Sequence, residues 1–165
     1  MAANQKKRLA LDTNLLLDLA RENDFAHDFR GVFQTANYSL LAGPTVFREL
    51  GFAVIWGRDA ERVLASTALA KAAKWGVLAF NLTSLDQAIA ERFAQRLLET
   101  RLLPMEEYND ALILAEAAVE NVPLLVTSDH HLLDMDEDTL ALAFTEAHLS
   151  AAHPVHPKAL LRAMR

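Results

Sequence analysis

The chain has 165 residues, of which 52% are hydrophobic and 23% charged, and it contains no cysteine. This composition can bury a full core, which excludes a disordered tail and a small disulfide-stapled scaffold, and the lack of cysteine excludes thiol catalysis and Cys-ligated zinc. The 22 acidic and 16 basic residues give a net charge of −6, which argues against bulk attraction to nucleic acid or to an anionic membrane.

The N-terminal segment is polar and basic, and no apolar stretch behind it is long enough for a signal peptide or a membrane span. We therefore expect a cytoplasmic protein that does not associate with membranes. No internal repeat, linker or low-complexity segment divides the chain, so we expect one domain over residues 1–165.

Short apolar runs alternate with helical patterns along the chain. The runs predict buried strands at 9–11, 38–42, 77–80, 124–127 and 151–156. The helical patterns predict helices at 15–20, 45–56, 58–75, 84–102, 108–120, 139–149 and 158–164. Thr45 is expected to cap the second helix, and the Ser84-to-Gln87 capping box to open the fourth. This alternation predicts an α/β sandwich around a mostly parallel sheet.

Two acids directly follow predicted strands, Asp12 after Leu11 and Asp129 after Ser128. In an open parallel sheet, ligands bind beyond the carboxyl ends of the strands, so both side chains are expected to face that crevice. The alternative is that each acid simply caps the helix that follows it, because Asp is a favoured N-cap residue.

Two further acids lie on predicted helices. Glu49 lies in mid-helix beside the apolar stripe, where a carboxylate is costly to bury without a cation or donor, and the alternative there is a buried ion pair with an arginine. Asp110 opens a helix and shares a face with Ile113 and Leu114, although an acid in a first turn is also favoured by the helix dipole.

Four carboxylates that converge on one crevice would repel one another unless cations neutralised them. Oxygen-only ligands select hard ions, so the set predicts a Mg²⁺ or Mn²⁺ site. Such a site fits metal-assisted hydrolysis of phosphodiesters. Without these four acids the chain has 18 acidic and 16 basic residues, a balance of −2, so the net charge no longer excludes a nucleic-acid substrate.

Four segments of this sequence resemble the PIN-domain ribonucleases, which include VapC-type toxins of bacterial toxin-antitoxin pairs, and the resemblance covers nearly the whole chain. The segments are Leu9–Asn14, Phe47–Leu50, Asp110–Ala117 and Leu125–Leu133. The resemblance implies a five-stranded parallel sheet flanked by helices, a homodimer and a small antitoxin partner.

The acidic tetrad of this family would fall on Asp12, Glu49, Asp110 and Asp129. Thr127 would hold the Asp129 loop, and Asn14 would brace the first acid. Two positions depart from the family pattern: His131 stands where many members have another Asp, and Glu107 stands where many have an Asp. A histidine at position 131 would contact phosphate or bind a softer metal.

The resulting hypothesis is a Mg²⁺- or Mn²⁺-dependent endoribonuclease that cleaves single-stranded RNA and acts as the toxin of a toxin-antitoxin pair. The alternative, motivated by His131, is a catalytically weak or inactive PIN-fold module that binds nucleic acid or protein. A receiver-like phosphotransfer domain is disfavoured because Asp12 has no acidic neighbour after the first strand. A zinc site built from the scattered histidines is disfavoured because they lack helix spacing.

Basic residues form three local groups: 6–8, Arg92 with Arg96, and Lys158 with Arg162 and Arg165. Such groups are usually solvated faces. A group that bordered the acidic crevice would instead follow a phosphate backbone.

Overall fold

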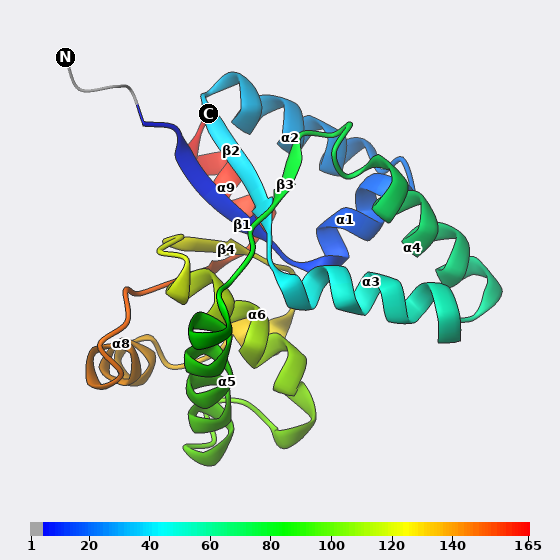
Figure 1. Ribbon diagram of the computed structural model, residues 1–165. Helices are drawn as coiled ribbons and strands as arrows, with labels where there is room; N and C mark the ends of the chain where they lie inside the picture. Colours follow the sequence, from blue (N-terminus) through cyan, green and yellow to red (C-terminus); the bar gives the residue numbers. More distant parts are fainter. Residues whose placement is uncertain (1–4) are drawn as a thin grey trace.

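The computed structural model describes residues 5–165 (Figure 1), so the first four residues of the basic N-terminal segment lie outside the described part. Five strands form one sheet in the order β3-β2-β1-β4-β5, and every neighbouring pair is parallel. The strands are β1 (Lys7–Leu11), β2 (Tyr38–Ala42), β3 (Val77–Ala79), β4 (Leu124–Val126) and β5 (His153–Val155). The predicted α/β class with a parallel five-stranded sheet is confirmed.

Helices cover both faces of this sheet (Figure 1). They are α1 (Thr13–Ala20), α2 (Asp24–Thr35), α3 (Pro44–Trp56), α4 (Asp59–Lys71), α5 (Ser84–Glu99), α6 (Tyr108–Val119), α7 (His130–Leu133), α8 (Glu137–Glu146) and α9 (Pro157–Ala163), with a 3-10 turn η1 (Met105–Glu107) before α6. Right-handed crossovers place α1, α2 and α4 on one face and α5, α6 and α8 on the other. The three-layer arrangement agrees with the prediction.

The strand order places the carboxyl ends of β1 and β4 side by side at the middle of the sheet. Leu11 of β1 pairs with Val126 of β4. From these two strands the sheet extends through β2 and β3 on one side and through β5 on the other. This point, where the strand order reverses, is where open α/β sheets bind ligands. Asp12 follows the first of these strands, and Thr127 follows the second.

The core lies between the sheet and its two helical layers. Leu9 and Leu11 of β1 are completely or almost completely buried, as are Phe29 and Phe33 of α2. Every residue of α6 from Ala111 to Ala118 is buried, because this helix packs against both α5 and α3. Burial on all sides explains why the sequence of α6 shows a continuous apolar run instead of a single stripe.

Four local predictions differ from the structure. The helix α2 was not predicted, although Asn23 caps it by accepting the Ala26 N–H. The short helix α7 was not among the predicted helices, although Asp129 was considered as the cap of a helix after it, and Asp129 does cap α7. Gly43, not Thr45, occupies the N-cap of α3, where Pro44 fixes the backbone of the first turn. Thr83, one residue before the expected capping box, caps α5 by accepting the Asp86 N–H.

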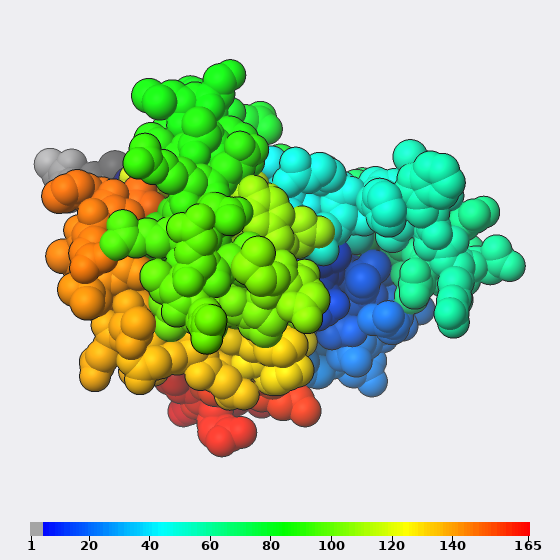
Figure 2. All heavy atoms as spheres, turned by 90° about the horizontal axis from the view of Figure 1, so that it is seen from below, coloured from blue at the N-terminus to red at the C-terminus, as the bar shows by residue number. Residues whose placement is uncertain are grey.

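The hairpin of α3 and α4 projects from the body of the molecule as an arm (Figure 2). Large apolar side chains are exposed along it: Phe52, Ile55, Trp56 and Val63 each expose more than 60% of their surface. Figure 2 shows a hollow between this arm and the yellow-green part of the chain, with a blue N-terminal segment at its floor. Among the described helices, none is both long and apolar enough to cross a membrane.

Candidate active site

Asp12 lies at the carboxyl end of β1 and is only 3% exposed. One carboxylate oxygen accepts the Thr13 N–H at 2.7 Å, and the other accepts the Thr127 hydroxyl at 2.6 Å. Burial raises the pKa of Asp12 to about 6, and the nearby charges of Glu49 and Asp129 add to this effect. Asp12 therefore caps α1 and also belongs to a group of acids, so the two interpretations of this residue are compatible.

Thr127 connects Asp12 with Asp129. Its hydroxyl oxygen accepts the Asp129 N–H at 3.0 Å while its proton is donated to Asp12. Asp129 in turn accepts the His131 N–H at 2.8 Å, which caps α7. One buried hydroxyl thus fixes the backbone of the Asp129 loop against the first acid.

Glu49 reaches the same place from α3. The Thr13 hydroxyl donates to its carboxylate at 2.6 Å, so the side chain points towards the start of α1. Among the ion pairs of the described residues, none involves Glu49. The arginine partner considered as an alternative is therefore not found there, and the carboxylate is held by a neutral donor.

Asp110, in the first turn of α6, meets two other carboxylates. One oxygen each from Glu107, Asp110 and Asp129 lies within 4.8 Å of the others. Burial raises the pKa of Asp110 to about 10, and hydrogen bonds with Glu107 and Asp129 contribute to the shift. At neutral pH and without a cation, this trio holds a proton that a divalent ion would displace.

These contacts bring Asp12, Glu49, Asp110 and Asp129 together at one edge of the sheet. Glu107, noted in the sequence only as a departure from the family pattern, belongs to the same group. The His131 ring nitrogen Nδ1 lies 3.3 Å from Glu107 and 3.6 Å from Asp129. Asn14, which was expected to brace Asp12, is exposed. The Thr13 backbone N–H donates to Asp12 in that role.

Glu116 is a functional candidate that the sequence analysis did not select. It is fully buried in α6 and accepts both the Thr45 N–H at 3.0 Å and the Thr45 hydroxyl at 2.7 Å. Burial raises its pKa. A glycine is required at position 43, because a Cβ there would lie 3.0 Å from the Glu116 carboxylate and 2.7 Å from Phe80. In the sequence, Glu116 could have been recognised as a lone acid within the apolar run of α6.

The Glu116–Thr45 contact ties together two helices that carry site residues. Thr45 and Glu49 lie one turn apart on α3, and Asp110 and Glu116 lie on α6. Arg48 supports the contact by donating to the Thr45 hydroxyl at 2.8 Å. The distance between Glu49 on α3 and Asp110 on α6 therefore depends on this buried pair.

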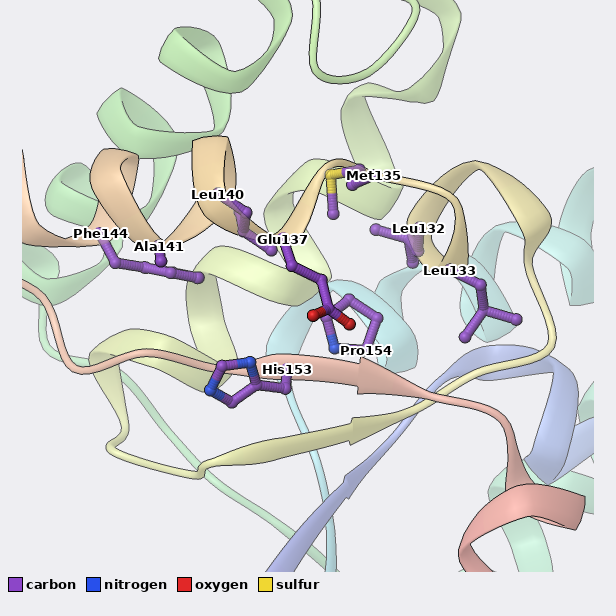
Figure 3. Close-up of a pocket in the computed structure, with 9 residues that line it drawn as sticks. All are labelled: Leu132, Leu133, Met135, Glu137, Leu140, Ala141, Phe144, His153 and Pro154. Atoms are coloured by element: carbon purple, nitrogen blue, oxygen red, sulfur yellow. The ribbon is translucent and has the colours of Figure 1, made fainter.

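A small pocket lies between α8 and β5, and none of the four predicted acids lines it (Figure 3). Its volume is about 40 Å³, and Leu132, Met135, Leu140 and Phe144 form its apolar wall. This space is too small for a substrate and is a gap in side-chain packing.

A known protein family and several solved structures resemble this chain. Residues 9–138 match the model of the PIN domain family. A search of curated proteins finds no significant match. Among solved structures, VapBC2 from Rickettsia felis bound to a DNA fragment from its promoter matches with a TM-score of 0.60 and 16% identity, over 89% of this chain and 98% of the other.

VapBC-1 from nontypeable Haemophilus influenzae matches with a TM-score of 0.55 and 15% identity, over 92% of this chain and 98% of the other. At such low identity these two likenesses concern the fold. The family model covers well over half of the chain and spans all of the acids described above. The protein belongs to the PIN domain family.

Proposed function

We propose that this protein is a divalent-metal-dependent endoribonuclease that hydrolyses phosphodiester bonds of single-stranded RNA, and that it is the toxin of a toxin-antitoxin pair. The observation that carries the proposal is the convergence of four carboxylates at the point where the strand order reverses. Neutral groups hold Asp12 and Glu49, so their charge remains available. Membership in the PIN family supports nuclease chemistry, because PIN domains are generally nucleases.

The residues present fit a Mg²⁺ or Mn²⁺ ion. Glu107, Asp110 and Asp129 offer oxygen atoms within 4.8 Å of one another, and the pKa of Asp110 is raised chiefly by burial and by hydrogen bonds with the two other acids. Asp12, Glu49, Asp110 and Asp129 would hold the ion. When bound, it supplies Lewis-acid stabilisation of the charge that develops on the phosphate.

The chain's own groups position the site and manage its protons. Thr127 and the Thr13 N–H orient the two oxygens of Asp12, and Thr13 Oγ1 orients Glu49. Asp110, whose pKa is raised to about 10, releases its proton when the site becomes charged by a cation. The buried floor formed by Asp12 and Thr127 excludes bulk water from one side of the site.

The test is cleavage of a panel of single-stranded RNAs with Mn²⁺, comparing the wild type with Asp12→Asn and Asp110→Asn. We expect both variants to lose cleavage. The matched control is Asp59→Asn, which changes an exposed acid at the start of α4 and should leave cleavage intact. Equal cleavage by wild type and site variants, or none by a folded wild type across the panel, would disprove the proposal.

One observation favours the alternative of a catalytically weak binding module. The His131 ring nitrogen Nδ1 lies 3.3 Å from Glu107 and 3.6 Å from Asp129, so the ring would occupy part of the space in which a cation would contact these acids. A calorimetric titration of single-stranded RNA into wild type and His131→Asp, with and without Mg²⁺, distinguishes the two functions. If the wild type takes up RNA without any divalent ion and does not cleave it, the binding module is correct.

We further propose that an antitoxin protein covers the α3–α4 arm. The two solved neighbours are named as VapBC assemblies, and the exposed Phe52, Ile55, Trp56 and Val63 give this chain an unusually apolar projection. A small partner with an apolar segment would bury these side chains. A second copy of the chain is proposed as a further partner, and light scattering of the purified protein tests for the homodimer.

A further inference from the structure

A second pocket adjoins the acids at the carboxyl edge of the sheet. It has a volume of about 300 Å³, and its walls come from α1, the start of α2, the end of β4 and the start of α9. Asp110 approaches the same edge from α6, on the other face of the sheet. In Figure 2 the yellow part of the chain lies between the hollow and the red C-terminal helix. Through the end of β4, the pocket therefore adjoins the loop that carries Asp129.

The pocket and the acids share a wall. Thr127 and Ser128 line the pocket, and Thr127 is the residue whose hydroxyl donates to Asp12 at 2.6 Å. Asp129 follows them directly in the chain. A polymer bound with one phosphate at the acids would therefore meet this pocket with its neighbouring unit.

The side chains around the pocket suit a nucleotide. The Lys158 ammonium lies 5.9 Å from the centroid of the Phe25 ring, and both residues line the space. A lysine is a point charge suited to a phosphate, and an aromatic ring stacks on any base. Among the ion pairs of the described residues, none involves Lys158. The one acid that also lines the pocket, Asp18, pairs with Arg21 at 3.0 Å, so its charge is balanced within α1 and the following turn.

His156 adds a directed donor to the same wall. Its Nδ1 accepts the backbone N–H of Lys158 at 3.1 Å, so the N–H of the neutral ring is on Nε2. This contact also fixes the backbone from which Lys158 projects. The pocket thus combines a cation, an aromatic ring and an N–H donor within one short stretch of surface.

The other basic groups do not offer this arrangement. Arg8 lies in β1, three residues before its carboxyl end, and contacts the Glu120 and Asn121 carbonyls. Arg96 faces the groove between α5 and α8, where it pairs with Glu146. Of the three basic groups, only the one that contains Lys158 borders the acidic crevice.

We propose that the pocket lined by Phe25, Thr127, His156 and Lys158 holds the nucleotide next to the scissile phosphate of single-stranded RNA. Lys158 contacts a backbone phosphate, and Phe25 contacts the base. This inference rests on the proposed ribonuclease function and adds the direction in which the RNA leaves the acids. The strand passes over Ser128 towards α9, and not along α5.

The test measures RNA affinity separately from cleavage. Fluorescence anisotropy follows a labelled single-stranded RNA binding to Asp110→Asn protein across a range of salt concentrations. Adding Lys158→Gln should weaken binding several-fold and reduce the slope of log affinity against log salt by about 0.7, the value for one lost phosphate contact on a single strand. Phe25→Leu, which retains apolar volume beside Phe29, should weaken binding about fivefold or more without changing the slope.

Lys74→Gln is the matched control, because it removes one exposed lysine charge in the turn after α4. Equal slopes for Lys158→Gln and Lys74→Gln would overturn the inference, and thermal melts of each variant check that it is folded. The result is independent of the proposed hydrolysis. A wild type that cleaves RNA while Lys158→Gln binds normally refutes only the pocket, and a wild type that never cleaves while the slope changes as expected refutes only the hydrolysis.

Discussion

Replacing Asp12 by asparagine should stabilise the metal-free protein at alkaline pH while it abolishes cleavage. In the fold the pKa of Asp12 is raised from 3.8 to about 6, chiefly by burial. A group with a raised folded pKa contributes fully to stability below its unfolded pKa, and this contribution is lost as the pH rises through the folded pKa. At pH 8 the ionised Asp12 therefore destabilises the fold relative to a neutral side chain.

The magnitude follows from the shift and from the hydrogen bonds. A shift of about two pKa units corresponds to about 3 kcal/mol, which an asparagine would recover at pH 8. Asparagine offers one acceptor oxygen where Asp12 uses two, so one of the bonds from Thr13 and Thr127 is lost at a cost of about 1 kcal/mol. The net gain is about 2 kcal/mol, or about 4–8 °C in Tm for a chain of this length.

The sign of the effect should reverse with pH. Well below the unfolded pKa of 3.8, the wild-type Asp12 is protonated in both states, so only the lost bond remains and the Asp12→Asn variant becomes less stable by about 1 kcal/mol. Urea unfolding in EDTA from about pH 3 to pH 8 measures both limits. A variant that is less stable than the wild type at pH 8 would refute the reasoning, because burial of the charge would then not dominate the environment of Asp12.

Three further predictions concern the supports of the site and the arm. Thr127→Val, which orphans the Asp129 N–H, should lower stability by about 2 kcal/mol in urea and weaken Mn²⁺ binding in calorimetry; unchanged Mn²⁺ binding would contradict its linking role. The free energy of unfolding of Glu116→Gln should lie within about 1 kcal/mol of the wild-type value at pH 8, because the raised pKa of Glu116 disfavours its charged form. Glu116→Ala should lower the free energy of unfolding by about 3 kcal/mol. Equal losses for the two variants in thermal melts would exclude this account. Trp56→Ser should abolish co-purification with a co-expressed antitoxin and leave Tm within about 2 °C, and retained co-purification would place the partner elsewhere.

The alternation of apolar runs and helical patterns was sufficient to predict the sheet. Residues 9–11, 38–42 and 124–127 lie in the central strands almost as predicted, because a strand buried on both faces is a continuous apolar run. The helix α2 was missed because its sequence is polar overall, although its apolar residues, Phe29 and Phe33 among them, do form the stripe of an amphipathic helix. The pattern of short runs does not detect such a helix.

The acids could be grouped from the sequence because strand ends and helix faces have predictable directions. What the sequence did not predict is how each acid is held. The Asp12–Thr127 contact joins residues 115 positions apart, and the Thr45–Glu116 contact joins residues 71 positions apart. Such pairings depend on the strand order and on the packing of α3 against α6, neither of which follows from local pattern.

Three threonines hold carboxylates in and beside this site, and the choice of residue has a physical consequence. Thr13 donates to Glu49, Thr127 to Asp12 and Thr45 to Glu116. A lysine or arginine in any of these places would orient the acid equally well, but its positive charge would neutralise the carboxylate and repel a divalent ion. A hydroxyl orients the acid and leaves its negative charge in place. Burial raises the pKa values of Asp12 and Asp110 in the metal-free protein, and a cation should therefore bind there with release of protons.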